Sequence, residues 1–533
     1  MKFIKRGLLI LLCATFLASC GTTKGAVQND TVKNEKTVKA DKKSEKEQKK
    51  GEKAKEKNKK KTAKSKKAKS GDYLAAINEA VNAGNYEEAY SLLSEETNRN
   101  SLGSDDIYKI DAGMINLYAE NYEEAIKHLY DVADMYKLQE KYDNADKVEL
   151  STLLLDPYST DYVTYDYEDM YAVIFDALAK LAQKDNPDTA DDAFQDLKSI
   201  RHMLKKMKVY KEKLLEKIDE ASPSDSKAPE AAGVVFSNSA LANYLALIYN
   251  KYNDHREGEN RDYFYKEMKK AYEQESYKGA KIPAAVKKET EDVPNGMARL
   301  NVVALMGLMA EKKGVSEEMT TPINAIVNGL SSDPAVKQLG VALDEITSIL
   351  TGGLSKRNIQ YDYTVLEPRD YNAKTCVIKI GDKEVTLDLI ENVNDISSAC
   401  MEKNIEFDKK RSKFRGTTRY IAAAATYVGA MYKTKDISNP LAKKGAVMAA
   451  GKALDTALDI IDENDKADIR GTHFFPAEVH AGALEIAPEK YNVTISFFSS
   501  PDPSPDTLIK SVTIPDVEIK AGELNLLTVQ CQE

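Results

Sequence analysis

Cysteine and histidine are scarce in this chain: five of each occur among 533 residues, and tryptophan is absent. Zinc sites and metalloprotease motifs need closely spaced pairs of such residues. The histidines show no such spacing; they are His128, His202, His255, His473 and His480. Residues 445–452 fail as a phosphate loop, because five residues instead of four separate the glycines and neither Ser nor Thr follows Lys452. No nucleophile elbow is present. We therefore predict no metal, no cofactor and no enzymatic activity.

The apolar run at the amino terminus, Leu8–Phe16, is too short to span a membrane as a mature helix. It follows three basic residues, the charge order of a secretory signal, and leads into Leu17-Ala18-Ser19-Cys20. This tetrapeptide resembles the lipobox of bacterial lipoproteins. The resemblance implies that residues 1–19 are a signal peptide and that Cys20 is the site of lipid attachment. The alternative is an ordinary signal peptide that ends in a cysteine by chance.

The lipobox resemblance also implies how the protein is held. The Cys20 thiol would carry a diacyl group, and the amino group exposed by cleavage would carry a third acyl chain. Three chains anchor a protein stably, whereas a single chain binds a membrane only marginally. We therefore expect a membrane-anchored protein. Gly21 favours the outer membrane with the body facing the periplasm, since Asp at that place is the familiar signal for inner-membrane retention.

Charges of opposite sign are segregated along the chain. Residues 22–70 contain 19 Lys against 7 Asp or Glu, a net charge of +12. Because the whole chain carries −9 and the signal region adds +3, residues 71–533 carry −24. Nucleic-acid binding depends on clustered lysine and arginine. We predict no nucleic-acid partner for this acidic body.

Residues 20–70 are predicted to be a disordered, lysine-rich tether that begins at the lipidated Cys20. They contain almost no large apolar residue, so burial cannot offset the entropy of ordering. A flexible chain of this length has an end-to-end distance of about 40 Å. The tether is either attracted to anionic lipid or cell-wall polymers or is a solvated spacer.

An internal repeat begins the body. The segment Asn85-Tyr86-Glu87-Glu88-Ala89 recurs as Asn121-Tyr122-Glu123-Glu124-Ala125, and Thr189–Ala193 is a weaker copy. These segments resemble the tetratricopeptide (TPR) repeat, in which a small residue sits where two helices cross closely. Gly113 is predicted to be the matching small site and Leu129 the large residue that packs there. We predict TPR-like helical repeats, an α-solenoid, over residues 71–285.

Tyrosines and acids are concentrated between these helices. Tyr162, Tyr165 and Tyr167 lie beside several Asp and Glu residues, just before a helix whose apolar stripe covers residues 171–182. Aromatic residues concentrate at interface hot spots, so these tyrosines are candidates for binding a partner. The alternative is ordinary packing between helices, because the chain has 29 Tyr and no Trp.

Residues 286–470 have a mixed pattern. We predict a strand at 300–305 and further strands within 358–389, including a hairpin that turns at residues 381–383. Two Ala- and Gly-rich segments, 420–432 and 441–461, are predicted to form a helical hairpin. Their small residues at helical spacing would let the two helices approach closely.

The last segment, residues 471–533, is predicted to be a C-terminal β module. Four alternating runs separated by turns and a Pro-rich loop indicate a small antiparallel sheet. The expected fold class is thus mainly α, with the solenoid followed by a mixed α/β region and this sheet. Cys376, Cys400 and Cys531 have no metal spacing, and they allow either one disulfide with one free thiol or no disulfide.

Several features together resemble an uncharacterised family of TPR-containing bacterial lipoproteins. They are the lipobox, the repeats, Val302–Gly307, the 375–389 hairpin and the box Ala467-Asp468-Ile469-Arg470-Gly471. In that family an aromatic residue usually follows the Ala-Asp-x-Arg box, whereas Gly471 follows it here. Members have no established activity, but they are often encoded beside lipoproteins that activate penicillin-binding proteins.

The functional prediction is a membrane-anchored periplasmic scaffold that binds a protein or peptide partner of the cell envelope, in connection with peptidoglycan synthesis. One alternative is a structural lipoprotein that bridges membrane and cell wall through the tether. The other is a cell-wall hydrolase, since a carboxylate-based hydrolase needs only two acids suitably spaced in three dimensions.

Overall fold

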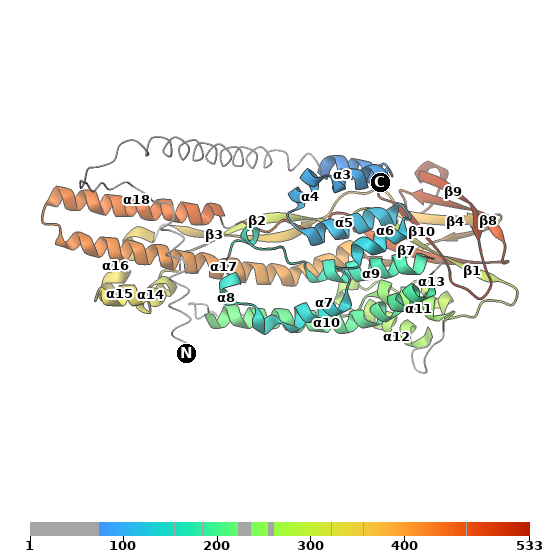
Figure 1. Ribbon diagram of the computed structural model, residues 1–533, viewed down its shortest axis with the longest axis horizontal. Coiled ribbons are helices and arrows are strands. Elements are labelled where there is room, and N and C mark those ends of the chain that lie inside the picture. Colours follow the sequence, from blue (N-terminus) through green and yellow to red (C-terminus); the bar gives the residue numbers. More distant parts are fainter. Residues whose placement is uncertain are drawn as a thin grey trace, which may run out of the picture.

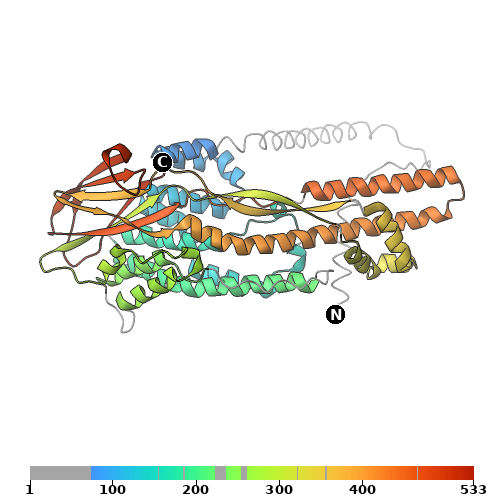
Figure 2. The same cartoon turned by 180° about the vertical axis from the view of Figure 1, so that it is seen from behind.

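The computed structural model describes residues 74–153, 155–183, 186–221, 236–253, 261–320, 322–354, 357–464 and 466–533. This part of the chain is mainly helical, and its strands form three sheets. The molecule is elongated, with sheets at one end, helices in the middle and a long helical hairpin at the other end (Figures 1 and 2). In these residues no helix combines the length and apolarity needed to cross a membrane. The predicted signal peptide, Cys20 and the tether lie outside the described residues.

The first part of the body consists of short helices joined by tight turns. Residues 74–82 are helical, and a turn at 83–85 leads into α3. The helices of this part are α3 (Tyr86–Ser94), α4 (Glu96–Leu102), α5 (Asp105–Tyr118), α6 (Tyr122–Leu129), α7 (Met135–Asp143) and α8 (Leu150–Leu153). Short 3-10 turns, η1 (Ala145–Lys147) and η2 (Pro157–Ser159), flank α8.

The two best repeat motifs occupy equivalent places, at the starts of α3 and α6. The preceding Asn85 and Asn121 have φ, ψ angles of −86°, 61° and −87°, 72°. Ala89 and Ala125 are completely buried. The close approach predicted at Gly113 is confirmed, because a Cβ added there would lie 2.5 Å from Cγ of Leu129.

Helix α9 (Asp166–Ala182) lies at the centre of the helical body. The sequence predicts an apolar stripe on one face, yet every residue from Tyr167 to Ala182 is buried. The reason is that α5, α6 and α10 (Pro187–Ala221) pack around it. Lys180 remains inside because its ammonium lies 2.7 Å from the Asp176 carboxylate. The next helices are α11 (Ala240–Asn250), α12 (Arg261–Tyr272) and α13 (Ala284–Glu289), with η3 (Glu275–Tyr277) between the last two.

The central sheet has the strand order β10-β1-β7-β6. Its strands are β1 (Ala298–Met306), β6 (Asp388–Asn392), β7 (Glu478–Ile486) and β10 (Asn525–Cys531). The predicted strand at 300–305 is confirmed within β1, which is buried along its whole length because both of its faces are covered. Val303 and Leu305 face the helical core, whereas Leu300, Val302 and Ala304 face the second sheet.

The predicted C-terminal antiparallel sheet is wrong, although its strands exist. The second sheet has the order β5-β4-β8-β9 and combines β4 (Thr375–Ile380) and β5 (Lys383–Thr386) with β8 (Lys490–Phe498) and β9 (Leu508–Glu518). The predicted hairpin is confirmed as β4 and β5. The C-terminal strands are divided between two sheets that share one core, and β10 pairs with β1 in parallel. Strand pairing therefore crosses the predicted boundary at residue 471.

A two-stranded ribbon leads away from the sheets. It pairs β2 (Glu311–Thr320) with β3 (Asn358–Glu367), of which only β3 was expected. Helix α17 (Val393–Lys433), 41 residues long, runs along the ribbon and is followed by η4 (Thr434–Asp436) and α18 (Pro440–Asn464). Three short helices complete this end: α14 (Ile323–Ser331), α15 (Pro334–Gln338) and α16 (Leu343–Leu354). The last 3-10 turn of the chain is η5 (Pro505–Thr507).

The predicted Ala-rich helical hairpin is confirmed by the packing of α17 on α18. The two glycines of α18 do not lie where the helices approach each other. A Cβ at Gly445 or Gly451 would meet nothing within 4 Å, because the first half of α18 is not buried. Only the second half of α18 enters a core, through Leu454 and Leu458. Separately, Cys376, Cys400 and Cys531 are free and buried.

Candidate functional site

The tyrosines predicted to bind a partner converge on one buried lysine, Lys312 of β2. The Lys312 ammonium lies 3.8 Å from the ring centre of Tyr165, 4.8 Å from that of Tyr162 and 5.8 Å from that of Tyr167. An ammonium is attracted to the negative face of an aromatic ring, and the attraction grows when water is excluded. The tyrosines therefore enclose a cation of their own chain. We call this arrangement the Lys312 junction.

The charge of Lys312 is balanced by Glu168 in the first turn of α9. Their charged atoms are 3.1 Å apart, and the two side chains are 3% and 0% exposed. Burial lowers the pKa of Lys312 below its ordinary value, and the neighbouring Glu168 carboxylate opposes that shift. Removing either partner would leave an isolated charge in a site without water, which is far more costly than losing an exposed pair.

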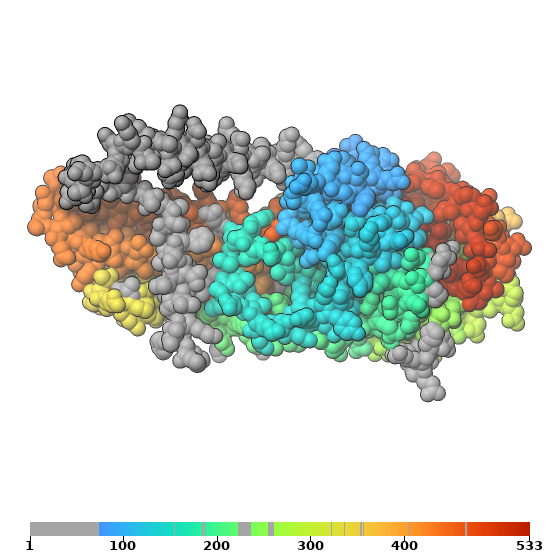
Figure 3. All heavy atoms as spheres, viewed as in Figure 1, coloured from blue at the N-terminus to red at the C-terminus, as the bar shows by residue number. Residues whose placement is uncertain are grey.

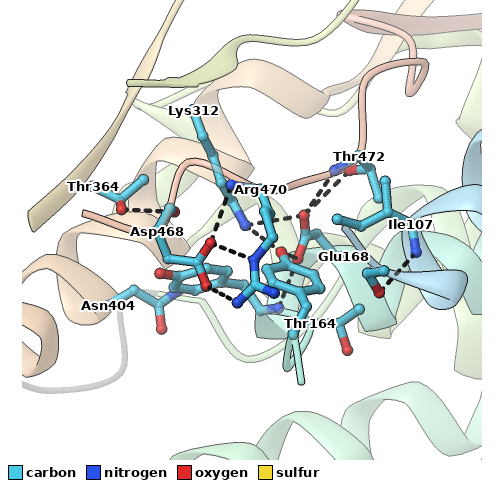
Figure 4. A network of polar contacts seen from close by, with 12 residues as sticks. Ile107, Thr164, Glu168, Lys312, Thr364, Asn404, Asp468, Arg470 and Thr472 are labelled. Atoms are coloured by element: carbon cyan, nitrogen blue, oxygen red, sulfur yellow. Dashed lines mark hydrogen bonds and ion pairs between the residues drawn. The ribbon is translucent and has the colours of Figure 1, made fainter. Parts of the chain in front are cut away.

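Glu168 is further held by hydrogen bonds from two other segments, the tyrosine segment and the segment at residue 472. It accepts from the backbone N–H of Tyr165 at 2.8 Å, from the backbone N–H of Thr472 at 3.1 Å, and from the Tyr162 hydroxyl. The bond from Tyr165 also caps α9, because Glu168 lies at the third helical position and reaches back to the residue before the helix. One carboxylate thus fixes the start of α9, the tyrosine segment and the residue-472 segment together (Figure 4).

The Ala-Asp-x-Arg box supplies the third side of the junction. Arg470 is paired with Asp468 at 2.8 Å and donates to the carbonyl oxygen of Pro157 at 2.7 Å and to that of Thr160 at 3.3 Å. Its guanidinium lies 5.2 Å from the ring centre of Tyr158 and 5.3 Å from that of Tyr162. The fixed fork of donors in arginine suits such a site. Figure 4 shows Arg470 and Lys312 approaching the same tyrosine segment from two different parts of the chain, the segment before β7 and strand β2.

Gly471, directly after the box, is closely approached by Lys312. A Cβ added at residue 471 would lie 2.8 Å from Cδ of Lys312. The stem of Lys312 therefore occupies the space in which a side chain at position 471 would begin. An aromatic residue has no room there while Lys312 is in place, and the aromatic side chains of this segment come later, at Phe474 and Phe475. Phe475 stacks on Phe175 of α9, with ring centres 5.7 Å apart.

The segment after the box is fastened to the first helices as well. The His473 ring nitrogen Nδ1 lies 2.7 Å from Asp111 of α5, and the backbone N–H of His473 donates to the same carboxylate at 2.8 Å. The Tyr118 hydroxyl donates to the carbonyl oxygen of Phe474 at 2.6 Å. His473 is thus engaged by a carboxylate of its own chain.

A second buried carboxylate, Glu391 of β6, also lies beside α9. It accepts hydrogen bonds from the hydroxyls of Tyr277 at 2.7 Å, Tyr171 at 2.9 Å and Ser239 at 2.9 Å, and from the backbone N–H of Leu241 at 3.0 Å. Burial raises the pKa of Glu391 above its ordinary value, against the effect of these hydrogen bonds. Among the described residues it takes part in no ion pair.

Both carboxylates serve to hold segments together. Each is completely buried, and its oxygens are occupied by donors of the same chain, so neither faces a space where a substrate would react. Within the described residues no group of three His, Cys, Asp or Glu is arranged to hold a metal ion. What the arrangement does is join α9, β2, β6 and the segment before β7.

The tyrosines of the Lys312 junction were predicted as a site from the sequence, but Lys312 was not. Tyr162 and Tyr167 are 6% and 1% exposed, and Tyr165 is half-buried and donates to Asp408 of α17 at 2.9 Å. Their role in binding a partner stays a prediction, and it would require the junction to open. Lys312 and Glu168 were not singled out, because nothing in the charged segment Glu311–Thr320 distinguishes the one buried lysine from its exposed neighbour. Cys20 lies outside the described residues.

Comparison with protein-family models, with curated proteins and with solved structures finds no match to this chain.

Proposed function

We propose that this protein is a lipid-anchored scaffold of the cell envelope, held to the outer membrane through acylated Cys20 and facing the periplasm. In this proposal its helical pairs are TPR-like repeats that bind a protein or peptide, and the partner belongs to the machinery that synthesises the cell wall. The activity is binding. The lipobox and the family resemblance support the anchor and the envelope setting.

The observation that carries the scaffold proposal is the equivalence of the two repeat motifs. The backbone before α3 and α6 has nearly the same conformation, and each motif places its alanine in the core. Gly113 and Leu129 form the close helix contact that such a repeat needs. Stacked helix pairs present an extended surface, which is how repeat proteins bind partners.

The accessible part of that surface is next to the second repeat. Tyr130 and Tyr136 are 63% and 86% exposed, whereas the tyrosines of the Lys312 junction are enclosed. Exposed tyrosines supply large contact area at interface hot spots. We therefore propose Tyr130 and Tyr136 as the first contact with the partner, while a contact at Tyr162, Tyr165 and Tyr167 would require the Lys312 junction to open.

Pull-down from crosslinked cells, read by mass spectrometry, tests this proposal. The wild-type chain should recover envelope proteins of cell-wall synthesis, and the N-terminal peptide should carry acyl chains on Cys20. Cys20→Ala should lose both the acyl chains and those partners. The double variant Tyr130→Ala/Tyr136→Ala should keep the anchor and lose the partners. Recovery of the same proteins with all three chains, or of wall fragments without proteins, would overturn the scaffold.

A further inference from the structure

The free end of the α17–α18 hairpin exposes apolar side chains that nothing in the described chain covers. Leu441 and Met448 of α18 are 86% and 65% exposed. From Pro440 to Ala453 no residue is buried, whereas Leu454 and Leu458 farther along the same helix are 5% and 0% exposed. Single exposed apolar residues are ordinary. Here two of the most exposed apolar residues lie on the part of α18 that is outside the core.

These residues fall on one face of the helix. Leu441, Gly445, Met448 and Lys452 follow one another at steps of four, three and four residues, which places them along one stripe. Leu343, at the start of α16, is 52% exposed. It lies at the same end of the molecule, because Glu345 of α16 forms an ion pair with Lys435 of the hairpin turn. This end of the molecule thus carries three exposed apolar side chains, those of Leu343, Leu441 and Met448.

The turn after α17 and the exposed first half of α18 are basic, unlike the body as a whole. Residues 420–454 contain five lysines and one acid, Asp436, a net charge of +4, while residues 71–533 together carry −24. Three of these lysines, at positions 443, 444 and 452, form no ion pair with any described residue. Lys433 ends α17. Charge of the opposite sign to the body is therefore gathered beside the exposed Leu441 and Met448.

The hairpin is also placed to reach a flat surface. A helix of 41 residues spans about 60 Å, so the turn after α17 lies far from the central sheet, next to which α17 begins. Figure 3 shows the orange and yellow segments, which include α18, α17 and α14–α16, forming the end of the molecule opposite the red C-terminal strands. A flat partner can contact this end of the molecule without contacting the helices in the middle or the sheets at the other end.

We propose that the distal end of the α17–α18 hairpin docks on an anionic phospholipid bilayer. Leu441 and Met448 would enter the boundary between headgroups and acyl chains, and Lys443, Lys444 and Lys452 would contact the lipid phosphates. Helices that expose apolar residues together with lysines bind membranes through buried apolar area and attraction to anionic lipid. The docking extends the proposed membrane attachment but does not depend on acylation of Cys20.

The absence of tryptophan makes a direct test available. In the mature chain, residues 20–533 with Cys20→Ser, the variant Leu441→Trp carries the sole tryptophan. On vesicles containing phosphatidylglycerol its emission should shift to shorter wavelength and should be quenched by lipids brominated in their acyl chains. The matched control is Tyr136→Trp in the same chain, because Tyr136 has the same 86% exposure as Leu441 but lies in the helical body.

This pair of variants separates docking of the hairpin from attraction of the lysine-rich tether. The tether brings both variants to the vesicles equally, but only a tryptophan within the bilayer is quenched by bromine on acyl chains. We expect quenching of Leu441→Trp to exceed that of Tyr136→Trp at least twofold. Adding Lys443→Glu and Lys444→Glu should abolish the difference, and vesicles of phosphatidylcholine alone should give none.

Three results would overturn the proposal. The first is equal quenching at positions 441 and 136. The second is an unchanged signal on uncharged vesicles or after the two lysine substitutions. The third is a blue shift without vesicles that grows with protein concentration, which would show that a second copy covers this face. Far-ultraviolet circular dichroism verifies that each variant is folded. Because the protein is unacylated, docking and the proposed anchor can fail independently.

Discussion

Glu168 and Glu391 are both completely buried carboxylates beside α9, but the protein accommodates them differently. Glu168 faces an ammonium, that of Lys312, and the two charges compensate each other. Glu391 receives only neutral donors, three hydroxyls and one backbone N–H. In the first arrangement the carboxylate lies 3.1 Å from an ammonium, and in the second burial raises the pKa of the carboxyl group. The comparison shows that two equally buried carboxylates can be held by different donors, a charged one and a set of neutral ones.

The largest expected effect comes from removing the cation of the first arrangement. Lys312→Met should lower the free energy of unfolding by about 3–5 kcal/mol, because Glu168 is left buried and unpaired. Denaturant-induced unfolding measures the loss. The matched control is Lys313→Met at the next residue, whose ion pair with Glu367 is exposed by 56% and 50% and should be worth less than about 1 kcal/mol.

The double variant Lys312→Met/Glu168→Gln makes this test sharper. With the carboxylate neutralised, most of the lost stability should return, since the cost in the single variant comes from the stranded charge. If Lys312→Met and Lys313→Met were equally stable, or if the double variant lost the sum of both changes, the contrast between the two carboxylates would be refuted.

A smaller loss is expected when the space for Lys312 is reduced. Gly471→Ala places a methyl group 2.8 Å from Cδ of Lys312, whose stem is buried, so unfolding should become easier by about 1–3 kcal/mol. Gly445→Ala is the control, because its methyl group meets nothing within 4 Å and alanine favours a helix by about 0.5–1 kcal/mol. Thermal unfolding should therefore shift in opposite directions for the two variants; a shift in the same direction would contradict the crowding at residue 471.

The smallest effect is expected at Glu391, and it depends on pH. Its folded-state pKa lies above the ordinary value of 4.5, so between these two values the folded protein binds more protons than the unfolded chain. Its contribution to stability is therefore greatest below pH 4.5 and falls as the pH rises through the folded-state pKa. Glu391→Gln removes this titration.

At pH 7, Glu391→Gln should be at least as stable as the wild type, and its advantage should shrink as the pH falls toward 4.5. Melting temperatures of the two proteins at several pH values measure the difference. Lys312→Met should be the less stable chain throughout the neutral range. A variant Glu391→Gln whose stability relative to wild type is independent of pH would show that burial does not raise the pKa of Glu391 in the folded protein.

Local patterns in the sequence predicted local structure, and they failed where contacts between distant segments determine which strands pair. The motif spacing located Gly113 against Leu129, and alternation located β3, β4 and β8, because these features depend on neighbouring residues. The division of the C-terminal strands between two sheets was missed, since no local pattern specifies that β7 pairs with β1 instead of β8. The charged segment of β2 was missed because its partner β3 begins 38 residues later.

The candidate site shows the same limit at the level of single residues. Tyrosine content marked the segment around Tyr165, and the Ala-Asp-x-Arg box marked Arg470. Lys312, which lies against the tyrosines and beside Gly471, carries no mark of its own, because its burial results from three segments that meet only in the folded chain. A lysine whose side chain is enclosed by tyrosines is indistinguishable in sequence from one in water.

The parallel pairing of β1 with β10 has a consequence for how the protein is made. Leu300 pairs with Asn525, so the central sheet gains its fourth strand only after 225 further residues have been synthesised. Until then β1 keeps one unpaired edge and two apolar faces, a combination that promotes aggregation. A chain delivered from its amino terminus must therefore be protected over this interval, and deleting the last strand should yield insoluble protein instead of a truncated but folded one.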